Sequence, residues 1–107
     1  MSSFDKREDT FESKFIHDAE LQFKVAARRN KLLGLWAAGL MGIEGDAAAE
    51  YAKTIVVADL KEDGDEDVFA KLRADFDAKG VEQSDHQIRR TMEELLGEAK
   101  NQIQKEG

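Results

Sequence analysis

Apolar residues recur every three or four positions along most of the chain, which is the spacing of amphipathic helices. The β-prone run at positions 54–57 is short and lies between helix-forming residues. The chain has no proline, so glycine residues mark the ends of helices. These features predict an all-α protein in which four helices with short connections form an antiparallel four-helix bundle over residues 18–107.

The first two helices are predicted from apolar stripes on either side of the stretch at 39–45, which contains three glycines. The first helix runs from about Asp18 to Gly42, and the second follows Gly45 with Asp46 as its N-cap. The stripe of the first helix comprises Leu21, Val25, Leu32, Trp36, Leu40 and Ile43, with Leu33 and Leu35 at its flanks. The stripe of the second comprises Ala48, Tyr51, Ala52, Ile55, Val56 and Leu60.

Local signals mark the ends of the third and fourth helices. Asp65 is the predicted N-cap of the third helix, and Gly80 is predicted to end it. Ser84 and Gln87 match a capping box at the start of the fourth helix. The predicted core positions are Val68, Phe69, Leu72 and Phe76 in the third helix, and Ile88, Met92, Leu95, Leu96, Ala99 and Ile103 in the fourth.

Residues 1–17 differ from the rest because they mix charges of both signs with three of the six phenylalanines. Phe4, Phe11 and Phe15 share one face if the segment is helical. This face either extends the first helix and packs on the bundle, or it forms a mobile, partly helical N-terminal arm. We favour an arm that becomes helical in a partner's groove, because a four-helix bundle already closes its own core.

The energy balance also favours an arm that needs a partner. Ordering the backbone of residues 1–17 costs on the order of 1–2 kcal/mol for each residue. Burying a phenylalanine side chain returns only about 1.5–3 kcal/mol. Three such rings therefore cannot order the segment, whereas a groove that contacts its whole length can.

Composition and charge narrow the functional classes. The net charge of −7 argues against nucleic acid as a main partner, because phosphate binding requires a basic surface. This charge also argues against adsorption to anionic lipid. No apolar run approaches the roughly 20 residues that are needed to span a bilayer. Without cysteine the chain has no disulfide and no thiolate metal site. We expect a cytoplasmic protein that is monomeric when free.

Candidate binding chemistry is sparse. Lys24, Arg28 and Lys31 lie on one side of the first helix and could bind an anion such as a nucleotide phosphate, although we favour a solvated flank that pairs with carboxylates. Arg29 lies at the edge of the apolar stripe, where its stem can pack while its guanidinium reaches a carboxylate. The loop at 59–67 resembles a calcium loop but lacks two of the required ligands, so we favour an acidic helix start.

The sequence carries no catalytic motif. It has no phosphate-binding glycine loop, no nucleophile elbow and no spacing typical of a zinc site. The two histidines, His17 and His86, are most simply ordinary surface residues. We therefore expect a protein that is not an enzyme, has no metal and needs no cofactor.

Three stretches resemble a known family. They are the string R-R-N-K-L-L-G-L-W-A-A at 28–38, G-D-E-D-V at 64–68 and S-D-H-Q-I-R-R at 84–90. Together with the phenylalanine pattern at the N-terminus, they are similar to the zeta subunit family, the alphaproteobacterial ATP synthase inhibitor. The resemblance covers essentially the whole chain, and the string at 28–38 is its most specific part.

This resemblance implies an inhibitory arm that binds the F1 part of ATP synthase and blocks rotation in the ATP-hydrolysis direction. It implies that the arm enters a catalytic interface between the alpha and beta subunits and approaches the central gamma shaft, so that the protein lies peripheral to the inner membrane. A helix of 17 residues is about 25 Å long, which is enough to lodge between subunits. The arm residues carried over by position are Phe4, Asp5, Arg7, Glu8, Phe11, Glu12, Lys14 and Phe15.

Two other hypotheses stay open. The first is a regulatory helical bundle that binds a nucleotide weakly on Lys24, Arg28 and Lys31. The second is a structural or assembly factor in which residues 1–17 serve only as a docking tag. Deleting residues 1–17 distinguishes these hypotheses, because a nucleotide binder keeps its ligand and an inhibitor loses its activity.

Overall fold

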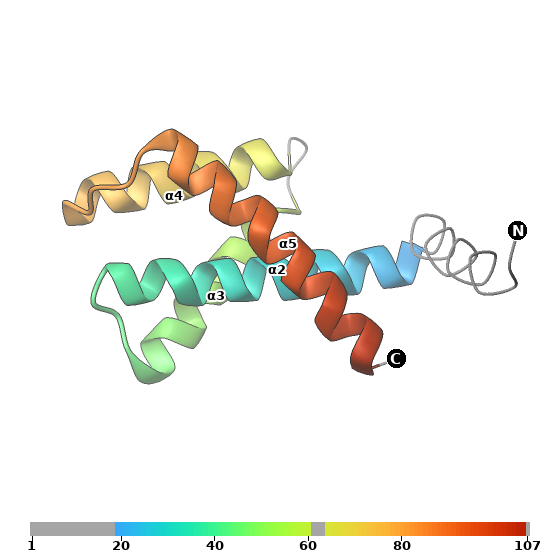
Figure 1. Ribbon diagram of the computed structural model, residues 1–107. Coiled ribbons are helices and arrows are strands. Elements are labelled where there is room, and N and C mark those ends of the chain that lie inside the picture. Colours follow the sequence, from blue (N-terminus) through green and yellow to red (C-terminus); the bar gives the residue numbers. More distant parts are fainter. Residues whose placement is uncertain (1–18, 61–63, 107) are drawn as a thin grey trace, which may run out of the picture.

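The computed structural model describes residues 19–60 and 64–106, and within these ranges it contains four helices and no strand. The helices are α2 (Ala19–Leu40), α3 (Gly45–Ala58), α4 (Asp65–Lys79) and α5 (Asp85–Glu106). Successive helices run in opposite directions, and α5 crosses α2 obliquely (Figure 1). The predicted all-α fold with four helices is confirmed. The arm predicted at residues 1–17 lies outside the described residues.

The main core lies where all four helices meet. It is built from fully buried side chains of every helix, including Leu33, Ile55, Leu72, Phe76 and Ile88. Trp36 packs against this cluster, with its ring edge-on to Phe76 at a centroid distance of 5.6 Å. The described residues therefore bury a continuous apolar centre.

A second, smaller cluster joins the start of α2 to the end of α5. Val25, Ala99 and Ile103 are buried there, and Leu21, Leu32 and Leu96 pack around them partly exposed. Counted over residues 19–60 and 64–106, the two clusters are unequal in size, and the start of α2 contributes to the smaller one.

Close packing of α2 on α3 depends on a glycine. A Cβ atom built at Gly34 would lie 2.5 Å from Ala52 Cα and 2.9 Å from Ala52 Cβ. Any side chain at Gly34 would therefore push the two helices apart. Small residues at this crossing let the two backbones approach each other.

The face of α2 that enters the core is rotated from the predicted one. Leu33, predicted at the flank, is fully buried together with Ala37, whereas Leu40 of the predicted stripe is 40% exposed. The reason is that α3 packs against the small residues around Gly34, which turns Leu33 inward. A stripe drawn through the largest apolar side chains misses a face that is built from small ones.

The predicted core of α3 is correct in part. Ala52 and Ile55 are buried, and Tyr51 and Val56 are partly buried. Leu60 is 67% exposed because α3 ends at Ala58, so its placement in the stripe was wrong.

The predicted faces of α4 and α5 are confirmed. Phe69, Leu95 and Leu96 are partly buried, and the remaining predicted positions are buried. Those buried residues are Val68, Leu72, Phe76, Ile88, Met92, Ala99 and Ile103. These two helices have apolar stripes of large side chains, which helical periodicity identifies directly.

Two of the predicted helix ends are confirmed. The Gln87 N–H donates to Ser84 Oγ at 3.1 Å, and the Ser84 N–H donates to Gln87 Oε1 at 2.9 Å. This reciprocal pair is the capping box. Gly80 ends α4 with a φ of 71°, in the left-handed region that favours glycine.

Two predicted N-caps are wrong by one or two positions. Glu44 is the N-cap of α3, which begins at Gly45, so Asp46 lies inside the first turn. Gly64 is the N-cap of α4, and Asp65 is its first residue. Asp65 does not cap the helix because its carboxylate binds an arginine of α2 instead.

Candidate functional site

The eight arm residues that the resemblance assigns to inhibition lie within positions 4–15, outside the described residues. The structure does describe the part of the bundle that follows the arm in sequence, where α2 begins at Ala19. This end of α2 extends beyond α3 and α4 and lies near the C-terminal end of α5 (Figure 1). Among the described residues, the surface beside the attachment of the arm therefore comes from α2 and α5.

An open groove of about 530 Å³ runs along this end of α2. It brings together the three basic residues that the sequence analysis singled out. Its lining residues are Leu21, Phe23, Lys24, Ala27, Arg28 and Lys31 from α2, and Ile103 and Glu106 from α5. The groove thus combines an apolar floor with a mainly basic rim.

Carboxylates partly compensate the basic rim. Arg28 donates from Nη2 to both carboxylate oxygens of Glu106, at 2.8 and 3.0 Å, and from Nη1 to Gln102 Oε1 at 2.7 Å. The Lys24 ammonium lies 3.5 Å from Glu20 Oε1, and Lys31 is exposed. These contacts are those of a solvated flank that pairs with carboxylates, and nucleotide binding on the same residues stays a prediction.

Phe23 is a residue of this surface that the sequence analysis missed. Its side chain is 61% exposed, although it is one of the six phenylalanines of the chain. It lies between Gln22 and Lys24, on the polar side of α2. A large aromatic residue among polar neighbours, off the apolar stripe, was the signal that could have identified it.

Arg29 follows Arg28 directly but is buried at 4% exposure. Its Nε donates to Asn30 Oδ1 at 2.6 Å, and its Nη2 donates to Asp65 Oδ1 at 2.7 Å. Asp59 Oδ1 lies 3.7 Å from the same Nη2 atom. The prediction that Arg29 packs its stem and reaches a carboxylate is confirmed.

The same contacts bear on the acidic stretch at 59–67, of which residues 61–63 lie outside the described ranges. Asp59 and Asp65, at its two sides, both face Arg29. Among residues 19–60 and 64–106, no three histidine or carboxylate side chains are grouped to hold a metal ion. Asp59 and Asp65 thus have an arginine as their partner.

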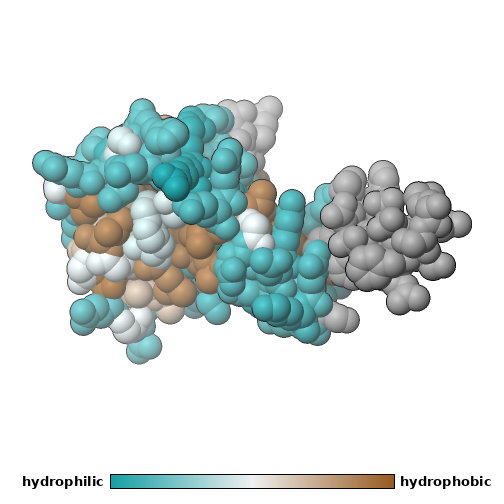
Figure 2. Space-filling view, viewed as in Figure 1, coloured by the Kyte–Doolittle hydropathy of each residue, from teal (hydrophilic) through white to brown (hydrophobic). Residues whose placement is uncertain are grey.

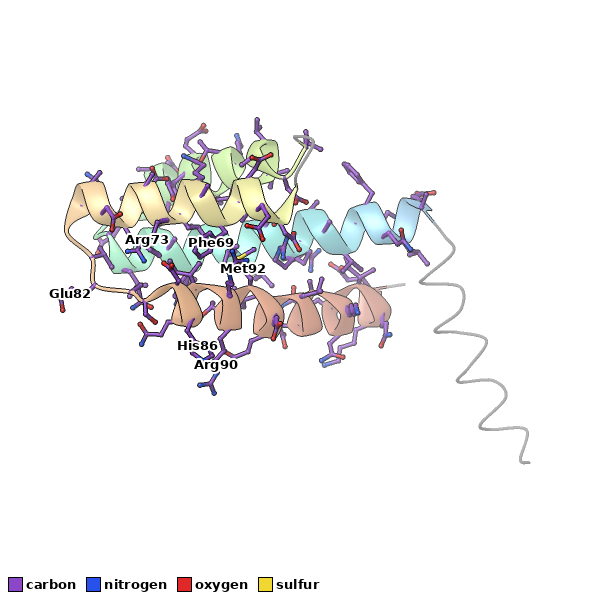
Figure 3. All side chains as sticks on the ribbon, turned by 90° about the horizontal axis from the view of Figure 1, so that it is seen from above. Phe69, Arg73, Glu82, His86, Arg90 and Met92 are labelled. Atoms are coloured by element: carbon purple, nitrogen blue, oxygen red, sulfur yellow. The ribbon has the colours of Figure 1, made fainter. Side chains whose placement is uncertain are left out.

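A further arginine joins α4 to α5. Arg89 forms two hydrogen bonds with Glu66, at 3.0 and 3.1 Å, and its guanidinium lies 4.0 Å from the ring centroid of Phe69. These hydrogen bonds, and the positive charge of Arg89, lower the pKa of Glu66 below its usual range. Phe69 and Met92 lie between α4 and α5, whereas His86 and Arg90 point outward (Figure 3).

The turn between α4 and α5 is held by Arg73. Its Nη1 donates to the Gln83 carbonyl at 2.6 Å and to Asp85 Oδ1 at 3.1 Å, and its Nη2 donates to Asp77 Oδ1 at 2.8 Å. The hydrogen bonds to Asp77 and Asp85 raise the pKa of Arg73. Arg73 therefore stays charged, and this basic residue serves the fold.

Comparison with known proteins connects these features to a family. The family model described as ATPase inhibitor subunit zeta matches residues 1–102. A protein structure solved by solution NMR is 44% identical, covers 81% of this chain and 99% of its own, and has a TM-score of 0.72. No curated protein sequence matches the chain. In the part of the chain that the structure describes, none of the helices is long and apolar enough to cross a lipid bilayer.

Proposed function

The chain belongs to the family of ATPase inhibitor subunit zeta, and from this premise we propose how it inhibits. Residues 1–17 bind the F1 part of an ATP synthase and block rotation in the direction of ATP hydrolysis. The arm enters an interface between the alpha and beta subunits and reaches the gamma shaft, and the bundle stays outside. The observation that carries this proposal is that the family match begins at residue 1, so it includes the arm as well as the bundle.

The division of apolar residues supports a role for the arm outside the bundle. The described residues form two hydrophobic clusters of their own, and each helix contributes to at least one of them. In this proposal the three phenylalanines of residues 1–17 fill a partner's groove. Aromatic side chains in such grooves supply much of the binding energy at interfaces.

The position of α2 supports a mechanical role. Because α2 begins at Ala19, an arm that becomes helical on binding could continue directly into a helix of 22 residues. A continuous helix is stiff, and arrest of a rotating shaft requires a stiff element between the moving and the fixed parts. The mixed charges of the arm would then set its register and its association rate more than its affinity.

The decisive experiment compares ATP hydrolysis by purified F1 with the full-length protein and with a variant that lacks residues 1–17. We expect inhibition only by the full-length protein, while circular dichroism shows the same helical bundle in both. Equal inhibition by the truncated protein would contradict the proposal, because the bundle would then be the inhibitor.

A finer variant replaces Phe11 and Phe15 together by alanine. If both rings are buried in the partner, inhibition should weaken by about 3–6 kcal/mol in binding free energy. Thermal stability should change little, and Leu60→Ala is a control because that side chain is 67% exposed on the bundle. A large fall in melting temperature would instead place the two rings in the core.

The groove at the start of α2 favours one second candidate function, which is binding of a nucleotide. Lys24, Arg28 and Lys31 line this one groove, as a phosphate site would require. Charge reversal at Arg28 and Lys31 should abolish nucleotide binding measured by calorimetry. If the variant still binds nucleotide, these residues do not form the nucleotide site. If the variant loses nucleotide binding but still inhibits F1, nucleotide binding and inhibition are separate functions.

A further inference from the structure

We propose that the groove between the start of α2 and the end of α5 is a second docking surface on the bundle. The groove binds an acidic surface of the ATPase that lies next to the site for the arm. That surface inserts an apolar side chain into the groove. This inference rests on the proposed function and adds a contact made by the bundle. The groove is lined by Phe23, Lys24, Arg28, Lys31 and Ile103, among others.

The first argument is the exposed aromatic ring. Phe23 is 61% exposed at the edge of a groove whose floor includes Leu21, Ala27 and Ile103. The volume of about 530 Å³ falls in the range of about 300–1,000 Å³ that is typical of ligand sites. Phenylalanine is enriched at protein interfaces, and an apolar partner side chain would bury both the ring and the floor.

The second argument is charge. The groove is lined by three basic residues, Lys24, Arg28 and Lys31, and one acidic residue, Glu106. The chain as a whole carries a net charge of −7, so this surface opposes the sign of the molecule. An acidic partner surface is complementary to it, and such complementarity raises association rates and fixes orientation.

The third argument is pre-organisation. Gln102 and Glu106 of α5 hold the Arg28 guanidinium through hydrogen bonds of 2.7, 2.8 and 3.0 Å. The backbone beneath is helical on both sides of the groove. A surface that is ordered before binding loses less conformational entropy when the partner arrives.

The fourth argument is continuity with the arm. The groove begins at Leu21, only a few residues after the predicted arm ends, so a partner that holds the arm also holds this surface close by. Contact at the groove is then intramolecular, and its high effective concentration lets a modest surface add to the affinity. The groove would thus prolong the bound state, while the arm performs the arrest.

The test uses full-length variants and inhibition of ATP hydrolysis by purified F1. Phe23→Ser should raise the half-inhibitory concentration by about tenfold while inhibition at saturation stays complete, because the arm is intact. Val57→Ser is the matched control, since Val57 is 58% exposed and lies outside the groove. It should leave the half-inhibitory concentration unchanged, and both variants should keep the wild-type melting temperature.

Charge is tested by the association rate at low and high salt. Lys31→Glu should slow association at low salt, and the difference from wild type should shrink as salt screens the charges. Lys79→Glu is the control, because Lys79 is an exposed lysine in the last turn of α4. Equal slowing by both variants would show an effect of net charge and overturn the assignment to the groove.

Other outcomes separate this inference from the proposed function. If wild type inhibits and Phe23→Ser inhibits equally well, the docking surface is excluded while the proposed function stands. Stronger inhibition by Phe23→Ser would show that the groove holds back the arm, and a changed oligomeric state would show that it binds a second copy. Either result overturns the proposal, and failure of wild type to inhibit overturns the function on which it rests.

Discussion

The two halves of α2 belong to one helix but are held in different ways. Its middle, residues 29–38, packs on α3 and the main core through Leu33 and Gly34 and carries the buried Arg29. Its beginning, residues 19–28, is anchored by the small cluster around Val25 and leaves Phe23 exposed. The half beside the arm therefore carries an exposed aromatic side chain, and the other half packs in the main core.

This difference also explains the most specific part of the family resemblance. The string at 28–38 contains a buried arginine that pairs with Asp65, a core leucine at Leu33 and a close helix crossing at Gly34. Each of these residues is required by packing within the bundle. The string thus identifies the family through its fold, while the inhibitory residues are proposed to lie in a different segment.

The largest expected effect on the free energy of unfolding comes from truncating one core side chain in each half of α2. Leu33→Ala should destabilise the protein by about 2–5 kcal/mol, because Leu33 is fully buried in the main core. Val25→Ala removes a smaller side chain from a smaller cluster and should cost roughly 1–2 kcal/mol. Urea unfolding measures both values, and equal losses would contradict the difference between the two halves.

The adjacent arginines form the next pair. Arg29→Ala should lower the free energy of unfolding by about 2 kcal/mol, because it leaves the buried Asn30 without its hydrogen bond. The loss is smaller than for a fully buried ion pair, because Asp65 is largely exposed. Arg28→Ala should cost less than about 1 kcal/mol, since its pair with Glu106 is near solvent. Unfolding free energies of the two variants test this order directly.

Replacing the two glycines of α2 by alanine should change the stability of the protein in opposite directions. Gly34→Ala should destabilise by about 1–3 kcal/mol, because its Cβ would lie 2.5 Å from Ala52 Cα. Gly39→Ala meets nothing within 4 Å and should stabilise by about 0.5–1 kcal/mol through helix propensity. Thermal melting should therefore shift in opposite directions, and a stabilising Gly34→Ala would exclude the close crossing.

The smallest expected effect concerns the exposed pair of Glu66 and Arg89. The pKa of Glu66 is lower in the folded state than in the unfolded state, so its contribution is present above the unfolded pKa. It is lost as pH falls through the folded pKa. The melting temperatures of wild type and Glu66→Gln should differ slightly at pH 7 and converge in acid, and a constant difference would contradict this origin.

Local features of the fold could be predicted from the sequence. The capping box of Ser84 and Gln87 and the left-handed Gly80 follow from hydrogen bonds and backbone angles within a few residues. The faces of α4 and α5 follow from helical periodicity, because all their buried positions except Ala99 carry large apolar side chains. The helix starts near Asp46 and Asp65 were misplaced because acidic residues are favourable both at N-caps and in first turns.

The candidate site could be predicted only in part. The three basic residues were found because helical spacing places them on one side of α2, and they do line one groove. The other wall of that groove comes from Ile103 and Glu106, and nothing local in the sequence indicates their neighbours on α2. Phe23 was missed because it lies off the apolar stripe, and only the packing of α5 on α2 shows that it lines this groove.

The sequence by itself determined the four helices, some of their ends, the arm's distinct composition and the family resemblance. These depend on interactions within about one helical turn and on residue patterns that can be read along the chain. The tertiary structure alone decided which face of α2 is buried, how closely it crosses α3 at Gly34, and which carboxylates pair with Arg28 and Arg29. Those partners are 78 and 36 residues away, so only the packing of helices on one another brings them together.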